Sequence, residues 1–392
     1  MPDWGQAREQ MMLAPDVTNL NTGSWGPTPK PVFERVTELR RHQACEPMDF
    51  ILRTTPPLLR RARTRLAEFL NSDPKCTIFT QNVSTAINIV ASGLSSEAPG
   101  EILMSDREYG CMHWCWERAA RRQGLAIKTF HLPLMPSSPG EIAAAVEAAI
   151  TPQTRLLFFS HVYSATGIVV PARDLCGLAR QRGVISVVDG AHAPAQIDLS
   201  VDDIDADFYA GNLHKWLLAP TGAGFLVLGR NSLDRLEPLQ VSWGYGHKSS
   251  SPDEPDEHGS TPRIRALEFE GTRDICPWLV VPDALDFQQS LGFNAIKSRM
   301  AELSEHARKR LEGLAGLRLT TPGEVELRGA MTAFWTEPEP ASNELRERLW
   351  KNRIEVPVMD WPDGRIVRIS THFYNTMDEI DRFAAIVPEL FS

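Results

Sequence analysis

Three side chains between positions 189 and 215 combine the groups that a pyridine aldehyde cofactor requires. Asp189 ends an apolar run, His192 follows three residues later, and Lys215 stands in Asn-Leu-His-Lys-Trp at residues 212–216. A lysine amine forms a Schiff base with an aldehyde, and a carboxylate keeps a pyridinium nitrogen protonated and electron-withdrawing. An aspartate and a lysine in this order therefore predict a site for pyridoxal 5'-phosphate (PLP).

The surroundings of Asp189 and Lys215 support this interpretation. The run Val-Ile-Ser-Val-Val before Asp189 is typical of a buried parallel strand, and ligands of such sheets bind beyond the carboxyl ends of the strands. Lys215 lies in an apolar, glycine-rich stretch, where desolvation lowers the pKa of an amine and makes it nucleophilic. The alternatives are an aspartate that caps a helix and a surface lysine after a strand.

A phosphate group needs a second anchor, for which residues 80–88 are the candidate. The segment Thr-Gln-Asn-Val-Ser-Thr-Ala-Ile-Asn looks like a strand, a turn and the start of a helix, with Val83 and Ser84 in its first turn. Free backbone N–H groups and small hydroxyls at a helix N-terminus bind phosphate well. Serine and threonine also cap most helices, so this signal gains its meaning from the lysine and the aspartate.

Short apolar runs alternate with helical patterns through the middle of the chain, which predicts an α/β fold with a parallel sheet covered by helices. After Pro282 the pattern changes to long amphipathic helices, which indicates a smaller α+β C-terminal domain, as the length of 392 residues also favours. Residues 251–263 read as a surface loop or domain junction, and Thr376 with Glu379 forms a plausible capping box. Strands are expected at residues 76–80, 101–105, 155–161, 184–189, 207–210, 224–228 and 366–370, and helices at 139–150, 172–182, 294–315 and 377–390.

Composition narrows the partners and the compartment. The 41 basic and 50 acidic residues give a net charge of −9, which disfavours nucleic acid and anionic membranes as partners. The first twelve residues are polar, and no apolar stretch is long enough to cross a bilayer. The six cysteines form no Cys-x-x-Cys pair, so reduced thiols in a cytoplasm are expected. Cys111 and Cys115 lie one helical turn apart near His113. They could form a metal site, but such a pair is more commonly incidental.

Five segments together resemble one family: LNTGSWGP at residues 20–27, DGAHA at 189–193, the stretch 211–224, EGTRD at 270–274 and VRISTHFYNT at 367–376. The chain resembles fold-type I PLP enzymes of the class V aminotransferase superfamily and, within it, isopenicillin N epimerase-like proteins. The resemblance implies a large PLP-binding domain at residues 21–265 with a mainly parallel seven-stranded sheet. It also implies an N-terminal segment, residues 1–20, packed on the small domain, and an interface segment with the small domain at residues 266–392.

The resemblance also implies roles for single residues. The Tyr109 ring stacks on the cofactor, where many relatives have histidine, and His192 lies beside the phenolic oxygen of the cofactor. Thr272 reaches the phosphate of the neighbouring subunit, which implies a homodimer with shared active sites, and Arg368 clamps the substrate carboxylate. In full, the implied catalytic residues are Lys215, Asp189, His192 and Tyr109, the implied cofactor contacts are Val83, Ser84, Tyr109, Ser164, Asp189, His192, Asn212, His214, Lys215 and Thr272, and the implied substrate contacts are Ser24, Trp25 and Arg368.

Three reactions stay open. Epimerisation or racemisation at Cα would use Lys215 on one face and an unidentified second acid on the other; β-elimination would cleave a carbon–sulfur bond; transamination would return the proton to the cofactor. The resemblance favours epimerisation, and the substrate is expected to be an amino acid or small peptide. Cysteine desulfurases of this superfamily carry a nucleophilic cysteine shortly before the carboxylate arginine, and residues 353–361 contain none. A non-enzymatic regulator is disfavoured, because the fold motif begins by Leu20 and leaves no room for a fused DNA-binding segment.

Overall fold

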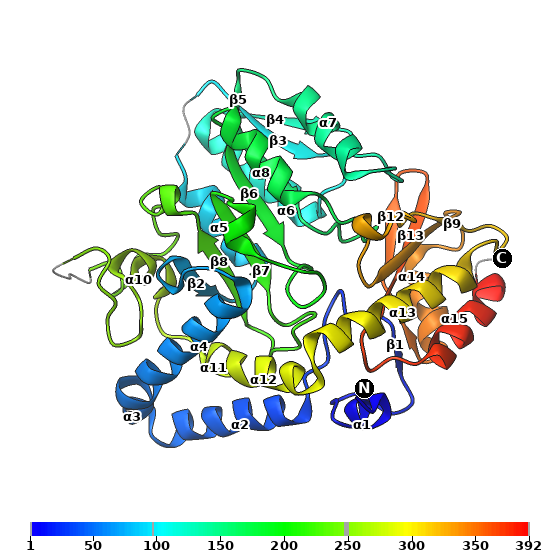
Figure 1. Ribbon diagram of the computed structural model, residues 1–392, viewed down its shortest axis with the longest axis horizontal. Coiled ribbons are helices and arrows are strands. Elements are labelled where there is room, and N and C mark those ends of the chain that lie inside the picture. The colour runs from blue at the N-terminus through cyan, green and yellow to red at the C-terminus, as the bar shows by residue number, and fades with distance from the viewer. Residues whose placement is uncertain (1, 96–97, 247–250, 391–392) are drawn as a thin grey trace.

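A seven-stranded sheet forms the centre of the protein (Figure 1). The structure, a computed structural model, describes residues 2–95, 98–246 and 251–390. The strand order is β2-β8-β7-β6-β5-β3-β4, and every strand is parallel to the others except β8, which is antiparallel to both of its neighbours. The strands are β2 (Thr77–Thr80), β3 (Glu101–Ser105), β4 (Ala126–Phe130), β5 (Thr154–Ser160), β6 (Ile185–Gly190), β7 (Phe208–Asn212) and β8 (Gly224–Leu228).

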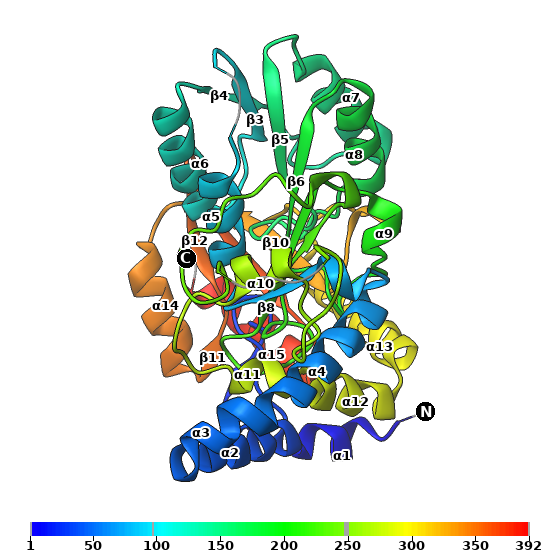
Figure 2. The same ribbon diagram turned by 90° about the vertical axis from the view of Figure 1, so that its left-hand side faces the viewer.

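Helices cover both faces of this sheet, which explains why its inner strands are continuous apolar runs (Figure 2). Ile102 and Met104 pack with α5 and α6 on one face, whereas Leu103, between them in β3, packs with α7 and α8 on the other. The helices of this part are α2 (Lys30–Cys45), α3 (Pro47–Asp49), α4 (Thr55–Leu70), α5 (Val83–Gly93), α6 (Gly110–Gln123), α7 (Pro139–Ala149), α8 (Ala172–Gln181), α9 (Val201–Ile204), α10 (Pro262–Glu268) and α11 (Cys276–Leu279).

The C-terminal part has a core of its own around a four-stranded antiparallel sheet of order β12-β13-β10-β9. The helix expected at residues 294–315 ends at Leu311, because Glu312 leaves the helical conformation and Gly313 and Gly316 take positive φ values. The elements are α12 (Val281–Leu291), α13 (Phe293–Leu311), β9 (Arg318–Leu319), β10 (Met331–Thr336), α14 (Ser342–Lys351), β11 (Ile354–Glu355), β12 (Val358–Trp361), β13 (Gly364–Ser370) and α15 (Met377–Leu390).

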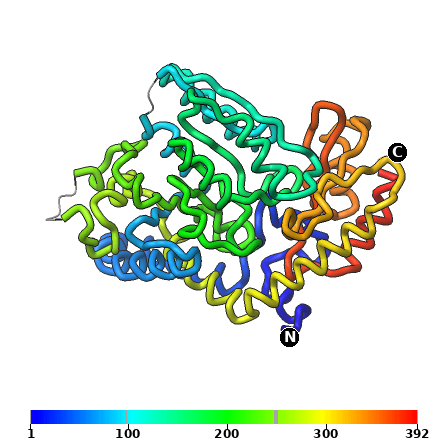
Figure 3. Tube along the Cα trace, turned by 45° about the horizontal axis from the view of Figure 1, so that its top comes forward, coloured from blue at the N-terminus to red at the C-terminus, as the bar shows by residue number. Residues whose placement is uncertain are grey.

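The N-terminal segment lies against this C-terminal part (Figure 3). Helix α1 (Trp4–Glu9) contributes Arg8, whose Nη2 lies 2.7 Å from Glu379 Oε1, and β1 (Thr18–Asn19) pairs with β11. The expected capping box of α15 is present: Thr376 N donates to Glu379 Oε2 at 3.0 Å, and Glu379 N donates to Thr376 Oγ1 at 3.2 Å. Within the described ranges, no helix is both long enough and apolar enough to span a membrane.

Candidate active site

A cavity of about 360 Å³ lies at the carboxyl edge of the large sheet. The sheet delivers Asp189 from β6 and Ser160 from β5 in register with each other, and the segments that follow β3 and β7 contribute further lining residues. Of the residues expected from the sequence, the cavity is lined by Ser24, Trp25, Val83, Ser84, Tyr109, Ser164, Asp189, His192, Asn212, His214 and Lys215. The structure therefore brings together side chains that lie up to 191 positions apart in the chain.

Asp189 is a buried carboxylate with capacity for a ligand. Its Oδ1 accepts a hydrogen bond from Ala191 N at 2.8 Å. Burial raises the pKa of Asp189, while the Ala191 hydrogen bond and the charge of Lys215 work against that rise. A positive partner such as a pyridinium N–H would offset the cost of burying this charge. Asp189 thus fits the ring nitrogen of PLP.

Lys215 and His192 form a contact that favours an uncharged amine. Lys215 Nζ lies 3.1 Å from His192 Nε2, and the indole Nε1 of Trp216 donates to His192 Nδ1 at 3.4 Å. Because an indole N–H can only donate, Nδ1 is the acceptor and the neutral ring carries its proton on Nε2. That Nε2–H can donate to Nζ only when the amine is neutral.

Electrostatics agree with this protonation state. Burial lowers the pKa of Lys215 to about 7, with a further lowering from the charge of Arg368 that Asp189 only partly opposes. Burial also holds the pKa of His192 well below its usual range. Lys215 can therefore act as a nucleophile and as a proton acceptor near neutral pH.

The backbone around Lys215 is held by the segment that carries Ser24 and Trp25. Gly26 N donates to His214 O at 3.0 Å, and a Cβ atom built on Gly26 would lie 2.0 Å from Lys215 O. Only glycine permits this approach. The close packing places Gly23, Ser24 and Trp25 on the wall of the cavity.

Donors converge at the start of α5, where a phosphate is expected. Asn82 caps the helix by accepting from Thr85 N at 2.9 Å, and Val83 N donates to Asn212 Oδ1 at 2.9 Å. Ser84 is exposed to the cavity in the first turn. His214 Nδ1 is buried and has no hydrogen-bond partner among the described residues. The first turn of α5 with its exposed Ser84, together with the orphaned buried ring nitrogen of His214 on the lining of the same cavity, fits the phosphate of PLP.

Arg368 is a buried cation whose hydrogen bonds go to neutral groups. From β13 it donates to Ser164 Oγ at 3.1 Å, to Ser24 Oγ at 3.2 Å and to Asn21 Oδ1 at 3.4 Å. No carboxylate of the described chain forms an ion pair with it, and its buried Nε has no partner there. Burial lowers the pKa of Arg368 to about 10, so the group stays charged. A buried guanidinium without an acid beside it is a site for an anion such as a substrate carboxylate.

Tyr109 and Trp25 are the large aromatic residues of the lining. Tyr109 precedes α6 and is half exposed. The indole of Trp25 donates to Thr221 Oγ1 at 3.0 Å, and its ring centroid lies 5.6 Å from that of His214. Both rings expose flat apolar surface toward a ligand.

The sequence did not indicate one buried carboxylate beside the cavity, that of Glu108, which directly precedes Tyr109. Glu108 accepts hydrogen bonds from Ser105 Oγ at 2.8 Å, Ser160 Oγ at 2.6 Å and Tyr163 Oη at 2.8 Å. Burial raises the pKa of Glu108 to about 7 despite these donors. The cage joins two chain segments, residues 105–108 and 160–163, so no spacing in the sequence could have indicated it. It fixes the backbone immediately before Tyr109.

Comparisons with known proteins agree with this geometry. The profile of the aminotransferase class-V family matches residues 27–383. The chain belongs to this family. It is 54% identical over 385 residues to an isopenicillin N epimerase of Streptomyces clavuligerus, with 97% of each chain covered. It is 53% identical to an isopenicillin N epimerase of Amycolatopsis lactamdurans, over 99% of this chain and 98% of the relative.

A solved structure carries the same fold. The cystine C–S lyase C-DES in complex with its reaction product cysteine persulfide matches with a TM-score of 0.84 at 24% identity, over 96% of this chain and 98% of that chain. The protein is thus a class V aminotransferase-family enzyme with the PLP fold type I architecture, and it depends on PLP.

Two sequence expectations lie outside the lining of the cavity. Arg368 is adjacent and reaches it through Ser24 and Ser164. Thr272 is exposed on the segment between α10 and α11 and does not line the cavity of its own chain.

The side chains of Cys111 and Cys115 in α6 lie in different surroundings. Cys115 is buried in the apolar core, whereas Cys111 Sγ lies 3.9 Å from Ser84 Oγ near the cavity. Neither belongs to a group of three metal-ligating side chains among the described residues.

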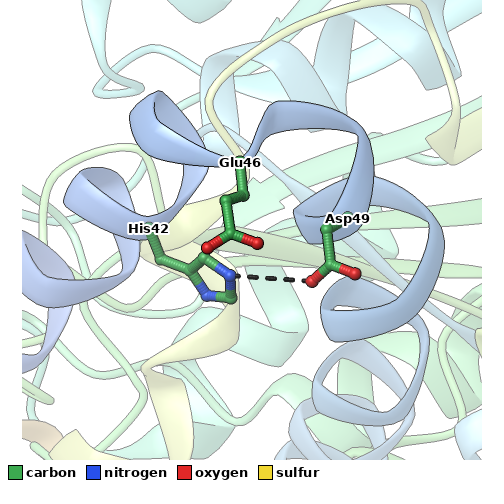
Figure 4. Close-up of side chains that lie close together, drawn as sticks. All are labelled: His42, Glu46 and Asp49. Carbon is green, nitrogen blue, oxygen red and sulfur yellow. Dashed lines mark ion pairs between the residues drawn. The ribbon is translucent and has the colours of Figure 1, made fainter.

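One such group does lie at the end of α2, where His42, Glu46 and Asp49 face one another (Figure 4). His42 Nε2 is 3.7 Å from Asp49 Oδ2, and Asp49 Oδ1 also accepts from Arg53 at 3.1 Å. These contacts are those of a surface ion-pair network, so we assign the group no role in the chemistry.

Proposed function

We propose that the protein epimerises the α-carbon of an amino acid or small peptide that carries a free α-amine and α-carboxylate, with isopenicillin N as the first candidate substrate. The observation that carries this proposal is identity of 54% and 53% along nearly the whole chain to two proteins named isopenicillin N epimerase. The cavity supports it with a lysine whose pKa burial lowers to about 7 and with the buried guanidinium of Arg368 beside it.

The charged and polar residues at the cavity have places in this chemistry. When bound, PLP joins its aldehyde to an amine and withdraws electrons from the substrate Cα. Lys215 provides the amine, Asp189 holds the ring nitrogen, and the α5 N-terminus with His214 holds the phosphate. Arg368 holds the carboxylate with its planar fork, which fixes the direction of the Cα–H bond. Lys215 then exchanges the Cα proton, a task for which a pKa of about 7 is suited.

Persulfide chemistry lacks its nucleophile here. Residues 353–361, which lead from β11 to β12, contain no cysteine. The thiol nearest to the lining, Cys111, has a pKa that burial raises, so it is a poor thiolate at neutral pH. β-Elimination without a cysteine is the second candidate, because a relative 28% identical over 95% of this chain is named a putative L-cysteine desulfhydrase of rice.

The test is incubation of the holoenzyme with isopenicillin N and a panel of L-amino acids in deuterated water. Deuterium at Cα together with inversion is the expected result. Pyruvate or thiol release would replace the proposal by a lyase, and keto acid that depends on an acceptor would replace it by an aminotransferase. Lys215→Ala is expected to lose the borohydride-reducible link to the cofactor; a link retained at another lysine would contradict its role.

We further propose a cytoplasmic homodimer with shared active sites. The exposure of Thr272 outside the cavity of its own chain supports the sharing, and six free cysteines support a reducing compartment. We also propose domain boundaries near residues 20 and 265; the pairing of β1 with β11 supports the first of them.

A further inference from the structure

Epimerisation requires two proton carriers, because the proton leaves one face of Cα and another arrives on the opposite face. This requirement rests on the proposed function. Lys215 supplies one carrier. The second must line the same cavity, approach from another side, and have a proton to give.

The other titratable groups of the lining either have a cofactor role or lie on the side of the lysine. Asp189 is a buried carboxylate at the end of β6 that fits the ring nitrogen. His192 uses Nδ1 toward Trp216 and Nε2 toward Lys215 itself, so it lies on the side of the lysine. His214 precedes Lys215 directly and packs against Trp25. Tyr109 is the remaining titratable residue of the lining.

Strand order places Tyr109 and Lys215 on opposite flanks of the cavity. Lys215 follows β7 and Tyr109 follows β3, and the sheet runs β7-β6-β5-β3 between them. Three strand intervals separate the two segments by roughly 14 Å. Asp189, at the end of β6, lies between these flanks, so a ligand bound to it has the lysine on one side and the tyrosine on the other.

The position of Tyr109 is fixed although its ring is half exposed. Its neighbour Glu108 is held by the hydroxyls of Ser105, Ser160 and Tyr163. This buried cage anchors the start of α6, so the phenol extends from a rigid point. Burial raises the pKa of the Tyr109 phenol, and the charge of Arg368, the group that fits the substrate carboxylate, opposes that rise. Tyr109 therefore lies within electrostatic range of the end of the substrate that carries Cα.

We propose that Tyr109 is the second acid–base residue, exchanging a proton with Cα from the flank opposite Lys215. Lys215 Nζ accepts the proton as the Cα–H bond breaks, and bound PLP would take up the electron pair of that bond. The Tyr109 hydroxyl then delivers its proton to the other face, and the pair forms the new C–H bond. Lys215 is left as an ammonium and Tyr109 as a phenolate, and the reverse transfer or exchange with water restores both.

The test compares Tyr109→Phe with the wild-type holoenzyme in deuterated water, each Cα epimer of the substrate being supplied separately. The variant keeps the ring and is expected to keep the visible cofactor spectrum. Its epimerisation should fall about 10²- to 10⁴-fold, the usual contribution of a positioned acid or base. Exchange of the Cα proton should persist for the one epimer whose Cα–H faces Lys215 and should be lost for the other. Undiminished epimerisation, or exchange lost equally for both, would overturn the proposal.

Two further variants separate proton transfer from ring position. Tyr109→His keeps a ring that carries protons near neutral pH and should recover at least about tenfold of the activity that Tyr109→Phe loses. An equal loss in both would mean that no proton is carried there. Tyr245→Phe, a change at an exposed tyrosine outside the cavity lining, is the matched control and should behave as wild type.

A measurement without cofactor or substrate tests the geometry. The ultraviolet titration of the Tyr109 phenol, isolated as the difference from Tyr109→Phe, should move to higher pH in Arg368→Gln, because the guanidinium favours the phenolate. No movement would place the phenol out of reach of the carboxylate site and overturn the proposal. If the wild-type enzyme exchanges no Cα proton with any substrate, the proposed function itself fails, whatever the variants do.

Discussion

The charge of Lys215 depends on neighbours from two other segments of the chain, the end of β6 and β13. Burial and the guanidinium of Arg368 disfavour the ammonium, Asp189 favours it, and His192 offers an N–H that only a neutral amine accepts. The site thus places two groups that can be positive, the Arg368 guanidinium and the Lys215 amine, around one substrate position. Holding both is tolerable because the lysine gives up its proton first.

The pH dependence of cofactor capture follows from this competition. Apoprotein mixed with PLP should form the covalent link at a rate that rises with pH and levels off above about 7, because only the neutral amine reacts. In Arg368→Gln the midpoint should move to higher pH, since the lost positive charge no longer opposes protonation. Stopped-flow absorbance measures both midpoints. Arg318→Gln on β9 serves as the control, and an unchanged midpoint in Arg368→Gln would contradict this account.

Glu108 makes the folded state less stable as the pH rises. An ordinary ion-paired acid, whose pKa is lowered on folding, has the opposite effect. Its folded pKa of about 7 lies above the unfolded value of 4.5, so the folded state binds the extra proton between these limits. The contribution of Glu108 to the free energy of unfolding is therefore fully present below about pH 4.5. It decreases by up to about 3 kcal/mol as the pH rises to about 7. In Glu108→Gln the free energy of unfolding, measured in urea, should fall less over this window than in wild type. Equal slopes would show that the carboxyl is ionised throughout.

At the scale of elements, a buried ion pair joins α4, β2 and α10. Arg63 and Glu268 meet through two hydrogen bonds of 2.7 and 2.9 Å, and their side chains are only 1% and 3% exposed. Arg63 also donates to Thr77 O at 2.7 Å, and Phe79 N donates to Glu268 Oε2 at 2.8 Å. The pair therefore satisfies backbone groups of β2, at the end of the large sheet.

Replacing one partner of this ion pair should lower the free energy of unfolding more than replacing both partners. Glu268→Ala leaves a buried guanidinium without its acid and should lower the free energy of unfolding by about 3–5 kcal/mol. The double change Arg63→Met with Glu268→Leu should cost less than the single change. Asp49→Ala, which breaks the exposed contact with Arg53, should cost less than about 1 kcal/mol. Urea unfolding of the wild type and the three variants measures these free energies. A double variant less stable than Glu268→Ala would refute the prediction.

The elements that the sequence predicted best are those with buried, uninterrupted runs. Strand β6 and its terminal Asp189 could be recognised because both faces of β6 are covered, and strands expected at 101–105 and 224–228 match β3 and β8. Strand β4 was missed because it lies at the sheet edge, where most of its side chains are partly exposed and no apolar run forms. The Glu108 cage and the Arg63–Glu268 pair were missed for another reason: each unites distant segments that only the folded chain brings together.

At the scale of the whole molecule, the proposed dimer concerns one cofactor contact expected from the sequence, Thr272. Thr272 is exposed and outside the cavity that its own Lys215 lines. If the proposed dimer places it at the partner's phosphate, Thr272→Val should weaken PLP binding roughly 10- to 100-fold through loss of one hydrogen bond to a charged group. Thr272→Ser, which keeps the hydroxyl, should bind PLP as wild type does.

Mixed dimers distinguish a shared site from a site within one chain. Co-expression of Lys215→Ala chains and Thr272→Val chains under two different affinity tags yields dimers that carry one of each. With shared sites, the Thr272→Val chain has Lys215 and receives Thr272 from its partner, so one site per dimer should bind PLP covalently with wild-type affinity. With unshared sites, each cavity lacks either the lysine or the threonine, and no wild-type site forms. Titration of the purified mixed dimer with PLP, followed by borohydride reduction and mass spectrometry, counts the modified chains and identifies which chain holds the cofactor.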